Sequence, residues 1–328
     1  MLRRWILVAL VAVGAGGCSD ALEQTSSAGQ VVAFGNTRTL SLITAVGFSV
    51  TTVDLPVGDT YASLAGRGNV LLMFRSGSIL NNSRVDVLDL ARADTTAGFT
   101  FGGNSLSGAV QDDSIAWVAL YDLGAVARVN YRTQVTSAIP VGGAPQAVAI
   151  TAGRVFVVNG SGTASWVSAV DPASRSVVDS IPLTGAGASA VVVGGDSLLY
   201  VIEAGPPQGR VSIVDPVARQ EVVVINGLSQ TVGSPVYHPS GHLLIPAGPD
   251  GMLDVNTLDR SLTLGPGHGV KPDGHGVIAL AIDNGGRVYA GDANCSLVHV
   301  LSGPPDYPKI RTVDVAGCPG TAATAIRP

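Results

Sequence analysis

The chain has 328 residues, of which 46% are hydrophobic and only 13% charged, and its formal net charge is −5. So low a charge density excludes a helical protein with solvated faces of Glu, Lys and Arg, and the 42 glycines favour short strands joined by tight turns. Lys271 and Lys309 are the only lysines and there is no basic run, which excludes a surface that follows nucleic-acid phosphates.

Residues 1–17 predict a secretory signal peptide. Arg3 and Arg4 give it a positive start, the stretch from Trp5 to Val13 is apolar, and small residues follow. The apolar stretch is shorter than the roughly 20 residues that a membrane-spanning helix needs. The leader therefore indicates export.

A cysteine follows this leader directly. The run Ala15-Gly16-Gly17-Cys18 resembles the lipobox of bacterial lipoproteins. The resemblance implies that Cys18 is lipidated and becomes the new N-terminus, and Ser19 after it implies the outer membrane. Ala15 stands where Leu is usual, so an ordinary cleaved signal peptide is the alternative. Residues 18–30 are polar and small, and we expect this lipidated segment to be a flexible tether.

Residues 31–328 repeat at a nearly constant interval. The segments Trp166–Pro172 and Arg210–Pro216 are both strands of alternating character that end in Asp-Pro. Weaker copies continue this register, and the copies end 41 to 45 residues apart, at Ala45, Asp89, Asn130, Asp171, Asp215, Asn256 and Leu301. Each interval holds four extended segments, which is typical of one propeller blade.

The seven intervals predict an all-β fold: a seven-bladed β-propeller with four antiparallel strands per blade. The first expected strand, Val31–Phe34, has no innermost strand before it, and the final segment Gly320–Ile326 looks like an innermost strand with no blade after it. Pairing these two chain ends in one blade would close the ring and cover its exposed edges.

Three phrases carry a family resemblance: Ala138–Ala149, Asp179–Leu183 and Val211–Asp215. They resemble the YVTN-type propeller repeats of exported bacterial and archaeal proteins, most clearly between residues 139 and 220. The tetrapeptide itself is degenerate, with Phe156–Asn159 as one copy. The resemblance implies the fold and leaves the activity open, because propellers serve many functions.

Polar residues follow six of the expected second strands. They are Asn36, Arg75, Tyr121, Asn159, Glu203 and Asp292. In a four-stranded blade these strand ends share a face with the crossovers between blades, so one interpretation is a ligand pocket at the channel mouth. The alternative, which we favour, is that these residues cap tight turns by bonding local backbone amides.

One crossover loop, Gly265–Gly276, contains His268, Asp273 and His275. Two histidines and an aspartate are suitable metal ligands, although their spacing matches no known motif and a solvated loop is the alternative. His238 and His242 flank a turn on the opposite face, and we expect both at the surface.

Cys295 and Cys318 are predicted to form a disulfide, because export places them in an oxidising compartment. Both lie on the crossover face of the expected ring. Closing the loop between them stabilises the fold by roughly 3 kcal/mol in the chain-entropy model.

No catalytic motif is present: the sequence lacks Gly-x-Ser-x-Gly, His-Glu-x-x-His and a phosphate-binding loop. We therefore predict a monomeric, non-catalytic binding or scaffolding module with no cofactor. Its partner would be an envelope protein, a glycan or a small molecule, with the membrane reached only through the lipid and no nucleic acid bound. The alternative is an enzyme with its site at the channel mouth, either a metal-dependent hydrolase or lactonase or a quinone-dependent dehydrogenase. The count of seven blades weakens that alternative, because propeller lactonases usually have six.

Overall fold

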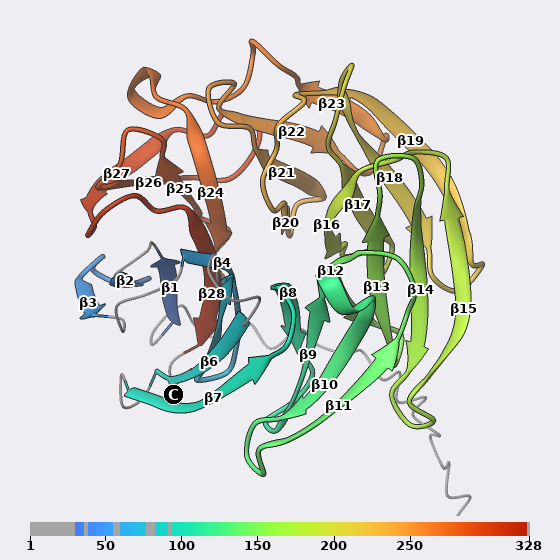
Figure 1. Ribbon diagram of the computed structural model, residues 1–328. Helices are drawn as coiled ribbons and strands as arrows, with labels where there is room; N and C mark the ends of the chain where they lie inside the picture. The colour runs from blue at the N-terminus through green and yellow to red at the C-terminus, as the bar shows by residue number, and fades with distance from the viewer. Residues whose placement is uncertain (1–29, 36–38, 55–59, 77–82, 91–93, 327–328) are drawn as a thin grey trace, which may run out of the picture.

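The computed structural model describes residues 30–35, 39–54, 60–76, 83–90 and 94–326. The predicted signal peptide, the predicted lipidation site Cys18, the expected tether up to residue 29 and Asn36 lie outside these residues. Within them the chain forms seven four-stranded antiparallel sheets arranged as blades around a ring (Figure 1). The predicted fold class is confirmed.

Blades 1 to 4 take up the first half of the chain, and β28 from the C-terminal end completes blade 1. Their strands are β28 (Thr321–Ile326), β1 (Gln30–Gly35), β2 (Thr39–Thr44) and β3 (Val50–Asp54); β4 (Thr60–Arg67), β5 (Val70–Ser76), β6 (Ser83–Asp89) and β7 (Asp94–Phe101); β8 (Ser105–Val110), β9 (Ile115–Leu120), β10 (Ala125–Asn130) and β11 (Val135–Pro140); and β12 (Pro145–Thr151), β13 (Arg154–Gly160), β14 (Ser165–Asp171) and β15 (Ser176–Leu183).

Blades 5 to 7 follow in the second half. Their strands are β16 (Ala188–Val193), β17 (Leu199–Glu203), β18 (Gly209–Asp215) and β19 (Gln220–Leu228); β20 (Val236–His238), β21 (His242–Pro246), β22 (Met252–Asn256) and β23 (Ser261–Leu264); and β24 (Val277–Ile282), β25 (Val288–Asp292), β26 (Leu297–Leu301) and β27 (Lys309–Asp314). Two short 3₁₀ segments, η1 (Tyr121–Leu123) and η2 (Pro272–Gly274), are the helical turns of the described chain. In that part of the chain no helix is long and apolar enough to cross a membrane.

The two ends of the chain meet in blade 1. Strand β28 pairs antiparallel with β1 along its whole length, from Thr321 opposite Gly35 to Ile326 opposite Gln30. The innermost strands β28, β4, β8, β12, β16, β20 and β24 contact one another in this order around the ring. The predicted closure is therefore confirmed, and β28 covers the inner edge of β1.

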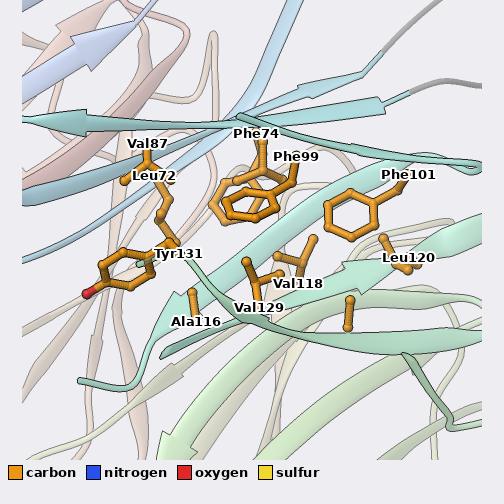
Figure 2. Packing of buried hydrophobic residues seen from close by; sticks show 12 residues of the cluster. Leu72, Phe74, Val87, Phe99, Phe101, Ala116, Val118, Leu120, Val129 and Tyr131 are labelled. Carbon is orange, nitrogen blue, oxygen red and sulfur yellow. The ribbon is translucent and has the colours of Figure 1, made fainter. Parts of the chain in front are cut away.

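The core lies between neighbouring sheets. Figure 2 shows one such layer, in which Phe74 and Phe99 of blade 2 pack against Val118 and Val129 of blade 3. Gly108 on the innermost strand β8 makes room for this layer, because a Cβ atom there would lie 2.6 Å from the Phe74 ring. Large apolar side chains thus fill the wedge between the sheets, and small residues occupy the crowded strands near the channel.

The disulfide prediction is confirmed, since Cys295 and Cys318 are bonded. Cys295 lies between β25 and β26, and Cys318 lies just before β28. The bond therefore ties blade 7 to the segment that leads into the ring-closing strand.

The expectation that both histidines lie at the surface is wrong for His238, and the side chain of His242 is only 15% exposed. His238 is 7% exposed, its Nε2 lies 2.9 Å from the Gly286 carbonyl, and burial lowers the pKa of its ring. His242 Nδ1 lies 2.8 Å from a buried Asp254 carboxylate oxygen. The hydroxyl of Tyr307, from the loop after β26, donates to the same carboxylate at 2.7 Å. His238 therefore contacts blade 7 directly, and Asp254 links His242 of blade 6 to Tyr307 of blade 7.

Candidate functional site

Four of the polar strand ends occupy the same place in their blades. We call this place the ladder-end position: it is the residue of the second strand that pairs with the innermost strand just before the β-bulge near the start of that strand. It holds Arg75, Leu120, Asn159, Glu203 and Asp292, opposite Tyr61, Ser105, Pro145, Ala188 and Val277. Tyr121 lies one residue beyond it, half-exposed in η1, because Leu120 takes the ladder-end position in blade 3.

These four polar side chains are buried. Each bonds to the third strand of its own blade, so it does not point into the channel mouth as the pocket interpretation requires. The pairs are Arg75–Asp86 at 2.9 Å, Asn159–Ser168 at 3.1 Å, Glu203–Arg210, and Asp292–His299 at 2.9 Å. Turn capping is part of the account for Asp292, whose Oδ1 accepts the Asn294 amide at 2.6 Å. The repeated element is a buried polar pair.

The channel holds a cavity of about 410 Å³ lined by all seven innermost strands or the residues leading into them. Its polar side chains are Ser63, Ser107, Gln146, Ser189, Ser234 and Thr321. β-Bulges at Gln146, Ser189 and Ile278 each insert an extra residue where the strand meets the cavity, which turns that residue toward the channel. The residues that line the cavity include no titratable side chain, and none of the described ladder-end residues is among them.

A smaller cavity of about 280 Å³ lies beside the ladder-end residue of blade 5. Glu203, 1% exposed, and Arg210 form an ion pair there. Burial raises the pKa of the Glu203 carboxyl, despite the hydrogen bond from Arg210. The carboxylate oxygen Oε1 has no hydrogen-bond partner among the described residues.

Blade 7 differs because three ligand-type side chains meet at its ladder end. Asp292 Oδ2 lies 2.7 Å from His275 Nδ1 and 2.9 Å from His299 Nε2. The three donor atoms lie within 4.8 Å of one another. Asp292 and His299 are buried, whereas the side chain of His275 is 37% exposed.

Further contacts hold these side chains in place. His299 Nδ1 lies 3.2 Å from the Thr312 hydroxyl on β27 and 3.8 Å from Asp273, which also pairs with Lys309. Burial acts to raise the pKa of the Asp292 carboxyl, but the hydrogen bonds that it accepts, above all from His299, hold that pKa below its usual range. The Asp292 carboxylate is therefore ready to act as an anionic ligand.

Sequence reasoning named two of these three residues. His275 and Asp292 were candidates on separate grounds, and the structure brings them together, whereas His268 stays exposed in the crossover loop. His299 was missed. Its signal in the sequence is a polar residue at a buried position of the otherwise apolar strand Leu297–Leu301.

Comparison with known proteins supports the fold. No protein-family model and no curated protein matches the chain. Similar solved structures include the hydrazine synthase of Kuenenia stuttgartiensis (TM-score 0.65, 15% identity, 80% of this chain and 89% of that chain). The Dos1 propeller is also similar (0.61, 13%, 88% and 85%), as is a functionally unknown protein from Desulfotomaculum acetoxidans DSM 771 (0.65, 12%, 91% and 98%). At these identities the likeness concerns the fold alone.

Proposed function

We propose that this propeller is a non-catalytic binding module of the cell envelope, which takes a small, uncharged, hydroxyl- or amide-bearing ligand in its channel. The observation that carries this proposal is the chemistry of the channel cavity. Its polar groups are hydroxyls and one amide, set among Ala, Val, Leu and Gly, and its volume of about 410 Å³ suits a small molecule. Such a lining hydrogen-bonds a neutral ligand and offers no countercharge to an ionic one.

The same lining argues against catalysis in the channel. General acid–base catalysis needs a titratable group near the reacting atoms, and a serine nucleophile needs an adjacent base. The residues around the cavity include no His, Cys, Asp, Glu, Lys or Tyr. A metal-dependent hydrolase or a quinone-dependent dehydrogenase at the channel mouth would need such groups there.

The proposed location at the cell envelope is supported by the predicted signal peptide and by the YVTN-like phrases. In this proposal Cys18 carries the lipid and the propeller acts as a monomer. Residues 19–29 are the tether that lets the propeller extend away from the membrane. Metabolic labelling with a radioactive fatty acid tests the anchor: the wild-type chain incorporates label and Cys18→Ala does not. Equal labelling of both would contradict the lipid anchor and leave the channel proposal standing.

The channel proposal is tested by a ligand screen with a matched pair of variants. Purified protein is screened by thermal shift against neutral sugars, peptidoglycan fragments and amides, alongside charged analogues. Gln146→Glu places a carboxylate in the cavity, whereas Gln220→Glu makes the same change at the exposed start of β19. We expect a neutral ligand to raise the melting temperature of the wild type and of Gln220→Glu but not of Gln146→Glu. Selective binding of charged compounds, or a ligand insensitive to Gln146→Glu, would overturn the proposal.

A further inference from the structure

We infer that His275, Asp292 and His299 form a binding site for one divalent transition-metal ion, and that zinc is the cation their chemistry fits best. Two imidazoles and one carboxylate suit zinc, and three protein ligands leave a fourth position for water. This site is separate from the channel, because none of the three residues lines the channel cavity. The inference therefore does not depend on the proposed ligand-binding function.

The donor atoms already converge. The two imidazole nitrogens lie 2.7 and 2.9 Å from Asp292 Oδ2. Ligand atoms around a tetrahedral zinc with bonds of about 2.0–2.1 Å lie about 3.3 Å apart. To bind the ion, the two imidazole nitrogens would move about 0.4 to 0.6 Å away from Asp292 Oδ2, and their own separation, which lies within 4.8 Å, would settle near 3.3 Å as well. The partly exposed side chain of His275 has the freedom to make this adjustment.

The residues behind the ligands are those that metal sites use. The second nitrogen of His299 meets the Thr312 hydroxyl at 3.2 Å, and Oδ1 of Asp292 is held by the Asn294 amide. Such outer contacts fix the orientation of ligands before the ion arrives. The Cys295–Cys318 disulfide adjoins the same strand end and limits the movement of the loop after β25. Binding would require little reorganisation.

Blade 7 also stands apart from the other blades. In blades 2, 4 and 5 the ladder-end residue pairs with a side chain of its own third strand. In blade 7 the crossover loop adds a further ligand, His275, on the solvent side. Within the described residues, this is the group of three or more His, Cys, Asp or Glu side chains close enough to hold an ion. The two buried ligands are held in place by the sheet, and the partly exposed His275 lets a cation reach them from solvent.

The test is zinc binding by the untagged, purified chain after treatment with EDTA. Isothermal titration with zinc chloride should give a stoichiometry near one, and His275→Ala should weaken the affinity about tenfold or more, the scale on which metal sites respond to altered ligation. His268→Ala is the matched control, because it removes an exposed histidine from the same loop; we expect its affinity to equal that of the wild type. Cobalt(II) added instead of zinc should produce the visible absorption of a tetrahedral ion.

Asp292→Asn, checked for folding by circular dichroism, provides a second variant that keeps the size of the side chain. It should also weaken zinc binding. A wild-type chain that binds no zinc, or equal losses in His275→Ala and His268→Ala, would overturn the site and show the three side chains to be a hydrogen-bonded network only. Zinc binding that both His275→Ala and Asp292→Asn leave unchanged would place the ion elsewhere and likewise overturn it.

Discussion

Blades 4 and 7 are built alike and differ in what fills their crossover ends. At the ladder-end position blade 4 has Asn159, bonded to Ser168, and blade 7 has Asp292, bonded to two histidines. Both side chains are completely buried. The backbone geometry is shared, so the difference lies in charge: blade 4 buries a neutral pair, and blade 7 buries a carboxylate that is bonded to one buried and one partly exposed imidazole.

The loops at these ends also differ in how firmly they are held. In blade 4 the loop after β13 is tied to the crossover by a backbone hydrogen bond of 2.9 Å from Gly187 to Ser161. In blade 7 the corresponding tie is the Cys295–Cys318 disulfide, beside a backbone bond from Ser296 to Gly317. The comparison teaches that one blade scaffold supports either a passive polar pair or a more rigid, charged group suited to ligation.

Replacing the ladder-end side chains of blades 4 and 7 by alanine should give the largest change in the free energy of unfolding. Asp292→Ala deletes three hydrogen bonds to a charged group, from His275, His299 and the Asn294 amide, each worth about 1.5–3 kcal/mol, so we expect a loss of about 3 kcal/mol or more. Asn159→Ala deletes hydrogen bonds between neutral groups and should cost about 1–2 kcal/mol. Urea unfolding in EDTA, which keeps metal out of the measurement, compares the two. Equal losses of unfolding free energy in the two variants would show that the charged group in blade 7 stabilises the fold no more than the neutral pair in blade 4.

Loss of the disulfide should have the next largest effect. Replacing Cys295 and Cys318 together by serine releases a link across 23 residues, and we expect the free energy of unfolding to fall by about 3 kcal/mol. Under reducing conditions the wild type should fall to the stability of this variant, whereas the variant should not respond to reductant. If the variant matched the oxidised wild type, the tie in blade 7 would be no stronger than the hydrogen bond in blade 4.

The smallest effect concerns pH and blade 5, where the ladder-end residue is Glu203. Burial raises the pKa of this carboxyl above its ordinary value of 4.5. The folded state therefore prefers the protonated form, and that contribution to stability is fully present below pH 4.5 and is lost as pH rises through the folded pKa. Glu203→Gln removes this dependence, so its stability relative to the wild type should increase from pH 4.5 toward neutrality.

Urea midpoints of Glu203→Gln and wild type across this pH range provide the measurement. Asn159→Ala is the control from blade 4, because its neutral pair should give a pH-independent difference from the wild type. A constant difference for Glu203→Gln would mean that Arg210 fully compensates the buried carboxylate.

The repeat made the ring predictable. Anchors every 41 to 45 residues, an unpaired first strand and an orphan final segment were sufficient to predict seven blades and their closure by β28 and β1. The cysteine pair was predicted from the inferred export, and the topology supported it because Cys295 and Cys318 fall on one face of the ring. Repetition averages over weak local signals, so a period that is faint in one blade is clear over seven.

What the sequence determined by itself is the architecture: alternating apolar strands at a constant period can bury their faces only by stacking against copies of themselves. What the tertiary structure decided is where the polar side chains point. Whether a strand end faces the channel or the neighbouring strand depends on ladder register and on bulges, such as the one at Ile278, that no local pattern reveals. That is why Asn159 and Glu203 turned out to be buried, and why His299 joins His275 and Asp292 only once three separate segments are folded together.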